Sequence, residues 1–170
     1  MTSTPDRLPS VVVQVPDEAA LGRLAARIAA ALPQRAFVAL EGDLGAGKTT
    51  FVKHVAAASG IDPAEVVSPT FGLIHAHEGP HGRLVHADFY RLSSGAELRE
   101  TGWEDALTGE PGRSCHVFVE WPGRVFADLP AERLDLAIAI DSETGRTLTL
   151  QARGAVYEPL LKALGAPPRA

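Results

Sequence analysis

Residues 41–51, with the sequence EGDLGAGKTTF, decide the fold because they contain the phosphate-loop pattern G-x-x-x-x-G-K-S/T at positions 42–49. The apolar run AFVAL at residues 36–40 precedes the pattern and predicts a strand that is covered on both faces. A helix is expected from about Lys48 to Ser59, where Gly60 ends it. A strand, a glycine-rich turn and a helix in this order favour a phosphate-binding site over an ordinary glycine turn.

Each residue type in this loop has a physical reason. Glycines let successive backbone N–H groups point inward and let the phosphates come close. The N-terminus of the following helix adds positive partial charge, while Lys48 is expected to reach the β- and γ-phosphates and the Thr49 hydroxyl to bind Mg²⁺. The residues expected to contact the nucleotide are Asp43, Leu44, Gly45, Ala46, Gly47, Lys48, Thr49 and Thr50. The chain contains no asparagine, so it lacks the Asn-Lys-x-Asp element that usually selects guanine, and ATP is preferred to GTP.

A magnesium ion on such a loop needs an acidic residue at the end of a neighbouring buried strand. Glu120 follows the apolar run CHVFV, and we favour it as the metal carboxylate, bound directly or through water. Asp88 ends the weaker run LVHAD, which a histidine interrupts and which lies in a predicted hairpin; it can share the metal shell or orient the attacking water. The alternatives are a solvent-facing acid for Glu120 and, for Asp88, a surface ion pair with Arg91 or a cap for the helix near Ser93.

The rest of the chain alternates helical and strand-like patterns. Strands are expected at residues 10–15, 71–78, 83–90, 115–119, 134–140 and 146–152, and helices at about 17–31 and 156–164. Residues 93–108 predict short helical structure interrupted at Gly95, Gly102 and Gly109. Loops at 79–82 and 141–145 join two hairpins. This order predicts an α/β fold: a P-loop NTPase-like three-layer domain whose mixed central sheet includes antiparallel hairpins. We expect a single nucleotide-binding domain at residues 10–164, with flexible tails at 1–9 and 165–170.

Composition and charge narrow the range of functions. The 170 residues include 16 Lys and Arg against 21 Asp and Glu, and the resulting net charge of -5 disfavours autonomous binding to DNA or RNA. No stretch reaches the ~20 apolar residues of a membrane span, and the first ten residues do not predict a signal peptide. The single cysteine, Cys115, excludes an internal disulfide framework and is typical of a reducing cytosol. We therefore expect a cytoplasmic protein that binds neither a membrane nor DNA.

Four motifs, in this order and at this spacing, resemble the TsaE family, formerly called YjeE. They are EGDLGAGKTTF at 41–51, SPTF at 68–71, HADFYRL at 86–92 and EWP at 120–122. The resemblance covers about residues 10–152. It implies a bacterial cytoplasmic ATPase that binds ATP, ADP and Mg²⁺ and is required for threonylcarbamoyl-adenosine modification of tRNA. It also implies TsaD and TsaB as protein partners, with tRNA met indirectly through their complex.

The resemblance assigns further roles residue by residue. The segment 68–70 is similar to the family's switch, in which Thr70 would sense the γ-phosphate. Trp121 matches a tryptophan beside the nucleotide site, and Arg146 matches a late arginine that contacts the nucleotide. The catalytic candidates are Thr70, Asp88 and Glu120, and the metal candidates are Thr49, Asp88 and Glu120. Ala87 and Gly123 depart from the aromatic and polar residues common in the family, which leaves the class of protein unchanged.

Two other functions compete with an ATPase. A small-molecule or nucleotide kinase needs an acceptor pocket and an Arg-rich lid, whereas here the segment after the second helix predicts a hairpin and the arginines are dispersed. A nucleotide-dependent scaffold would bind ATP and partners without turnover. Because no Arg-rich lid is evident, we expect an ATPase that is slow in isolation.

Histidines on the first hairpin raise a metal alternative. If that hairpin pairs symmetrically, His75 lies opposite His86 and His77 shares their face, so three imidazoles are candidates for zinc. No fourth ligand is evident, and a half-exposed polar face is the preferred interpretation. Cys115 is expected to be a small buried hydrophobe and Trp103 to pack between helices.

Overall fold

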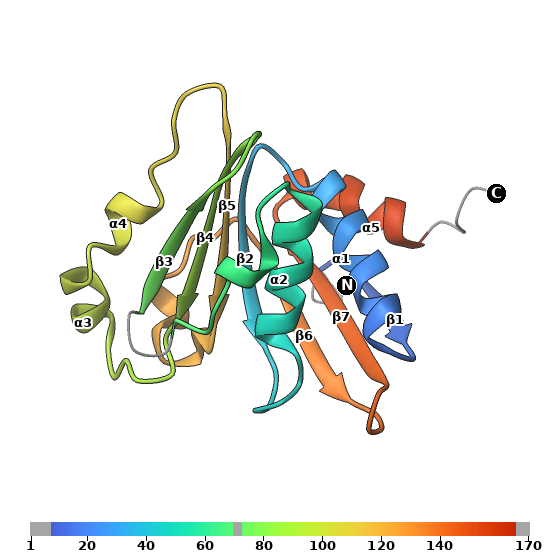
Figure 1. Cartoon of the computed structure of the whole chain (residues 1–170). Helices are drawn as coiled ribbons and strands as arrows, with labels where there is room; N and C mark the ends of the chain where they lie inside the picture. The colour runs from blue at the N-terminus through green and yellow to red at the C-terminus, as the bar shows by residue number, and fades with distance from the viewer. Residues whose placement is uncertain (1–7, 70–72, 166–170) are drawn as a thin grey trace, which may run out of the picture.

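A computed structural model describes residues 8–69 and 73–165, which form a seven-stranded sheet with helices on both faces (Figure 1). The strands are β1 (Ser10–Val15), β2 (Arg35–Glu41), β3 (Ile74–Glu78), β4 (Gly82–Asp88), β5 (Ser114–Glu120), β6 (Arg133–Ile140) and β7 (Arg146–Arg153). The α-helices are α1 (Glu18–Ala31), α2 (Lys48–Ala58), α3 (Gly95–Glu100), α4 (Trp103–Ala106) and α5 (Glu158–Gly165). Short 3₁₀ helices are η1 (Pro63–Glu65), η2 (Pro122–Asp128) and η3 (Ala155–Tyr157).

The sheet is mixed, in the order β1-β7-β6-β2-β5-β4-β3, so the predicted fold class is confirmed. Strand β2 pairs in parallel with β5 and β6, and β4 pairs in parallel with β5. The pairs β1–β7, β6–β7 and β3–β4 are antiparallel and extend the parallel centre on both sides. The carboxyl ends of β2, β4 and β5 therefore meet at one edge of the sheet, where ligands bind in open α/β folds.

Two apolar clusters cover the two faces of the sheet, and the central strand β2 contributes to both. Its residues Val38 and Leu40 pack toward the cluster beneath α1, α2 and α5, whereas Phe37 and Ala39 belong to the cluster that includes residues of α3, α4 and η2. The five central residues of β2 are all buried, as the continuous apolar run predicts for a strand covered on both faces. Figure 1 shows α1 and α2 in front of the sheet and α3 and α4 on its β3 side.

Element boundaries follow local chemistry. Helix α1 begins after Asp17, whose carboxylate accepts a hydrogen bond from the Ala20 N–H at 2.8 Å. The helical segment expected at 93–108 is divided at Gly102, one of its predicted breaks, which adopts a left-handed φ of 75° between α3 and α4. The expected strand 71–78 is β3 from Ile74 onward, and its residues 71 and 72 lie outside the described residues.

The placement of Trp103 corrects the expectation that it packs between helices. Its ring meets the edges of Phe37 and Phe89 at centroid distances of 5.6 and 5.1 Å, so it packs from α4 against side chains of the sheet layer. Cys115 is buried, as expected for a small hydrophobe, and burial raises the pKa of its thiol. None of the helices in the described part of the chain has the length and hydropathy needed to cross a bilayer.

We predict that His116 makes the fold sensitive to acid. Its Nε2 lies 3.1 Å from the Pro33 carbonyl oxygen, and burial lowers its pKa although this hydrogen bond partly opposes the shift. The unfolded chain then binds more protons than the folded chain below the ordinary histidine pKa of about 6.5, so the free energy of unfolding falls as the pH falls. His116→Gln should reduce the shift in urea midpoint between pH 7.5 and pH 5.5.

The exposed His81 provides the control for this measurement. His81→Gln should leave the acid-induced shift as in the wild type. Some shift should remain in His116→Gln, because burial also lowers the pKa of His77. Equal shifts in the two variants would contradict the assignment to His116.

Candidate functional site

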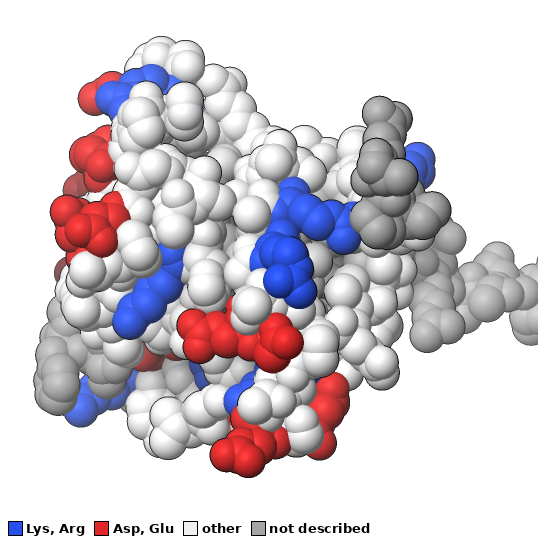
Figure 2. Space-filling view, turned by 45° about the vertical axis from the view of Figure 1, so that its right-hand side comes forward, with Lys and Arg blue, Asp and Glu red and all other residues white. Residues whose placement is uncertain are grey.

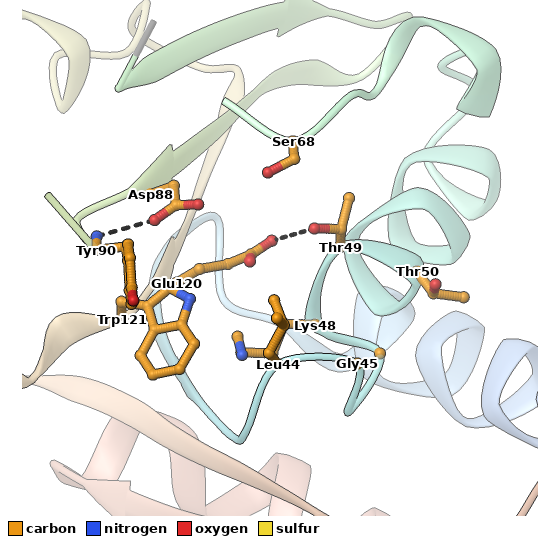
Figure 3. Close-up of a pocket in the computed structure, with 11 residues that line it drawn as sticks. Leu44, Gly45, Lys48, Thr49, Thr50, Ser68, Asp88, Tyr90, Glu120 and Trp121 are labelled. Carbon is orange, nitrogen blue, oxygen red and sulfur yellow. Dashed lines mark hydrogen bonds between the residues drawn. The ribbon is translucent and has the colours of Figure 1, made fainter. Parts of the chain in front are cut away.

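A cavity of about 530 Å³ opens at the carboxyl edge of the parallel strands, between the start of α2 and the ends of β4 and β5 (Figure 3). Its lining comes from the phosphate loop, the segment after η1, and the residues at the ends of the two strands. The lining residues are Leu44, Gly45, Gly47, Lys48, Thr49, Thr50, Ser68, Asp88, Tyr90, Glu120 and Trp121. Residues of all four sequence motifs therefore meet around one space.

The phosphate loop requires glycine at two positions for different reasons. Gly47 has a left-handed φ of 104° and immediately precedes α2. The carbonyl of Gly47 accepts a hydrogen bond from the Phe51 N–H at 2.8 Å. At Gly42 a Cβ would lie 2.7 Å from the carbonyl oxygen of Ile138 on β6. The first glycine therefore lets the loop pass close to the sheet, and the last one turns the chain into the helix.

Arg146 supports the loop from β7. Its Nε donates to the Ala46 carbonyl at 2.9 Å and its Nη2 to the Gly45 carbonyl at 3.3 Å. The same guanidinium donates to carbonyls of the β6–β7 turn, including that of Ser142 at 3.0 Å. Arg146 does not line the cavity, so the structure places it behind the loop, in contact with its backbone.

The ammonium group of Lys48 lies within the site, and its side chain is 5% exposed. It donates to the carbonyl of Gly42 at 2.5 Å and to that of Asp43 at 3.2 Å, and it lies 4.1 Å from the centroid of the Trp121 ring. Burial lowers the pKa of Lys48, while the negative charges of Glu120, Asp88 and Asp43 raise it. The carboxylates thus favour the charged ammonium that phosphate binding needs.

Glu120 is held by two donors that meet on one oxygen. The Thr49 hydroxyl donates to its Oε1 at 2.7 Å, and Nε2 of His86 lies 2.7 Å from the same atom (Figure 3 shows the Thr49 bond). Glu120 is 4% exposed and ends β5, so the alternative of a solvent-facing acid is wrong. The first turn of α2 and two parallel strands are joined at this carboxylate.

Asp88 is the register partner of Glu120 across the parallel β4–β5 pair. It is 4% exposed, and its Oδ1 accepts a hydrogen bond from the Tyr90 N–H at 2.9 Å. The alternative of a surface acid is therefore wrong, and the cap of α3 is Ser94, whose hydroxyl accepts from the Glu97 N–H. Although β4 belongs to a hairpin, it also pairs in parallel with β5, which the sequence pattern did not reveal.

Trp121 has a left-handed φ of 55°, an uncommon conformation for a residue other than glycine. Its ring packs edge-on against Tyr90 at a centroid distance of 5.1 Å. In the following helix η2, the guanidinium of Arg133 lies over the Phe126 ring, 4.2 Å from its centroid. Backbone strain of this kind is found most often at functional sites, where the surrounding packing maintains it.

The structure brings most of the predicted site residues together. Those that line the cavity are Leu44, Gly45, Gly47, Lys48, Thr49, Thr50, Asp88, Glu120 and Trp121. Asp43, Ala46 and Arg146 lie in or behind the loop without lining the cavity. Thr70 lies outside the described residues.

Sequence reasoning missed two residues. Tyr90 lies at the cavity wall, and its position two residues after Asp88 was the available signal. His86 begins the HADFYRL motif, but the sequence predicts no role for it beside Glu120, against which it is fully buried.

The donor set at this site fits Mg²⁺. Thr49 and Glu120 offer a hydroxyl and a carboxylate oxygen, and Asp88 adds a second carboxylate to the same cavity. Magnesium prefers oxygen ligands and usually takes only one or two carboxylates, completing its shell with water and phosphates. Among the described residues no group of three or more histidine, cysteine or acidic side chains is arranged to hold a metal. The predicted pairing of His75 with His86 is confirmed, but the zinc alternative gains no support.

Comparisons with known proteins agree in pointing to one family. The family described as "Threonylcarbamoyl adenosine biosynthesis protein TsaE" matches residues 15–148. A relative from Bacillus subtilis, named tRNA threonylcarbamoyladenosine biosynthesis protein TsaE, is 38% identical over 125 residues, which cover 74% of this chain and 75% of the relative. A protein of the same name from Rickettsia bellii is 33% identical over 112 residues, 66% of this chain and 74% of its own length. The crystal structure of Bacillus subtilis YdiB matches with a TM-score of 0.70 and 29% identity over 92% of this chain and 95% of that chain.

We predict that Arg146 supports nucleotide binding through the loop backbone. Arg146→Gln removes charge-assisted donors from the Gly45 and Ala46 carbonyls, and we expect about tenfold weaker binding of a fluorescent ATP analogue. Arg23→Gln, at an exposed position of α1, is the matched control and should bind as the wild type does. Unchanged affinity in Arg146→Gln would show that the loop keeps its shape without this support.

Proposed function

The chain belongs to the TsaE family, and on that premise we propose that it is the magnesium-dependent, ATP-hydrolysing subunit in the biosynthesis of threonylcarbamoyladenosine in tRNA. The observation that carries this proposal is the meeting of the Lys48 ammonium, the Thr49 hydroxyl and the Glu120 carboxylate around one cavity. Phosphoryl transfer needs little covalent chemistry from the protein, so catalysis depends on positioned charge.

Thr49 can serve a metal ion and Glu120 at the same time. Its hydroxyl donates its hydrogen to the carboxylate at 2.7 Å and keeps its lone pairs for a cation. A magnesium ion bound there supplies positive charge for the phosphoryl oxygens. Lys48 adds a second positive charge, and the loop N–H groups at the start of α2 add hydrogen-bond donors.

The hydrogen bonds support different roles for Glu120 and Asp88. Thr49 donates to Glu120, which favours Glu120 as the carboxylate on the metal side. Asp88 lines the same cavity from the neighbouring strand, and we assign it the orientation of the attacking water. The switch role of Thr70 stays a prediction from the resemblance.

The chain between α2 and β3 favours an ATPase over a small-molecule kinase. A kinase of this class builds its acceptor pocket from an insertion, whereas the described residues between these elements contain only the three-residue helix η1. A phosphate site for which the sequence offers no Arg-rich lid suits slow hydrolysis that a partner completes.

We propose TsaD and TsaB as the partners, with tRNA met indirectly through them in the cytoplasm. The net charge of -5 supports indirect contact with tRNA. On the face that Figure 2 shows, basic and acidic side chains lie in small separate groups, with no broad basic surface among the described residues.

We predict that Glu120→Gln separates binding from hydrolysis. The amide keeps the size of the side chain but removes the charge that holds the metal shell, so ATP should still bind while turnover falls at least ~100-fold. Phosphate release and titration with a fluorescent ATP analogue measure the two quantities.

Lys48→Ala is the comparison for this variant, because it is expected to lose ATP binding itself. Near-normal turnover in Glu120→Gln would transfer the metal role to Asp88. Equal ATP affinity in Lys48→Ala and the wild type would remove the basis for a nucleotide site at this loop.

We further predict that turnover in isolation is slow and that partners raise it. Steady-state phosphate release is measured for the protein alone and with its cognate TsaD–TsaB pair. A rate alone of the order of 10 per second, the median for ordinary enzymes, that partners leave unchanged would contradict the switch function. A labelled small-molecule product would indicate a kinase, and stoichiometric retention of ATP would indicate a scaffold.

A further inference from the structure

His86 is a buried polar residue with a single hydrogen-bonding contact at the site. It lies in the middle of β4, between His75 on β3 and Phe118 on β5, and its side chain is 0% exposed. Its Nε2 is 2.7 Å from Oε1 of Glu120. Its Nδ1 is buried, and no group in the described part of the chain bonds to it.

This geometry defines the tautomer. An ionised carboxylate can only accept, so with Glu120 ionised the Nε2 atom of His86 is the donor at 2.7 Å. A hydrogen on Nδ1 would be a buried donor without an acceptor, which is costly. The imidazole therefore orients the carboxylate through a single N–H donor.

The kind of donor matters at a metal site. A lysine or arginine in the same place would cancel the charge on Glu120 that attracts a cation, whereas a single N–H donor leaves it in place. Both donors, Thr49 and His86, end on Oε1, so Oε2 is the oxygen left to face the metal shell.

We propose that His86 is the positioning residue of the nucleotide site, which holds Glu120 through Nε2–H in the orientation that serves magnesium. The inference rests on the proposed function, in that it assigns Glu120 to the metal side. Residues that orient a metal carboxylate are typically worth 10–100-fold in metal affinity or activity.

Two amide substitutions at position 86 distinguish loss of the N–H donor from loss of the imidazole ring. Glutamine can place an N–H near the position of Nε2, whereas the shorter asparagine places one near that of Nδ1 and does not reach Glu120. His86→Gln should therefore restore most of what His86→Asn loses. His75→Asn, at the register partner on β3, is the matched control and should behave as the wild type does.

The measured quantity is the tightening of ADP binding by Mg²⁺, obtained as the ratio of Kd in EDTA to Kd in magnesium. His86→Asn should lower this ratio about tenfold without changing the Kd in EDTA, and His86→Gln should return it to within about threefold of the wild type. In a Glu120→Gln background, His86→Asn should cause no further loss, because its effect passes through that carboxylate.

Several results would overturn the proposal. The Kd ratio could be the same in His86→Asn as in the wild type, or His86→Asn and His86→Gln could lower it equally. ADP binding in EDTA could weaken in His86→Asn as much as binding in magnesium does. The wild-type ratio could also be one, which would mean that Mg²⁺ does not tighten ADP binding. If His86→Asn does not fold, His86→Thr replaces it, since threonine suits a strand and its hydroxyl is too short to reach Glu120. Absence of ATP hydrolysis by the wild type, alone and with partners, would refute the proposed function while the Asn–Gln difference in ADP binding still tests His86.

Discussion

One oxygen of Glu120 accepts hydrogen bonds from both Thr49 and His86, and this shared acceptor joins α2, β4 and β5 at the carboxyl edge of the sheet. Thr49 is the second residue of α2 and Glu120 is the last residue of β5, so the bond fixes how the helix start meets the strand end. On the other side of the loop, Arg146 holds the carbonyls of Gly45 and Ala46 from β7. The phosphate loop is therefore held from two directions by residues that lie far from it in the sequence.

The burial of charge is concentrated at this place. Of the five buried polar or charged side chains in the described residues, four belong to the site: Lys48, His86, Asp88 and Glu120. Buried charges are costly unless they are paired, and here each one has oppositely charged or hydrogen-bonding neighbours. A core selected for stability alone would favour apolar side chains at these positions, so the cost indicates a functional requirement.

The sequence predicted the loop, its flanking strand and helix, and the two acids, because each depends on short-range patterns. The pattern G-x-x-x-x-G-K-S/T and the apolar run before Glu120 are local features of this kind. The role of His86 could not be predicted in this way, because it depends on the parallel pairing that sets β4 beside β5. Arg146 was assigned to the nucleotide through resemblance, yet its contact with the loop backbone depends on the placement of β7. The split of α3 from α4 falls at Gly102, a local break that the sequence itself indicates.

The pairing of β1 with β7 has a consequence for synthesis on the ribosome. Among the described strands, β1 at the edge of the sheet pairs with β7 alone, which is the last strand in the sequence. Strand β7 also carries Arg146, which contacts the phosphate loop. Until β7 emerges, the uncharged β1 strand SVVVQV has no described strand beside it, and an unpaired edge of this kind can join other chains. The arrival of β7 therefore both covers the edge of β1 and brings Arg146 to the phosphate loop.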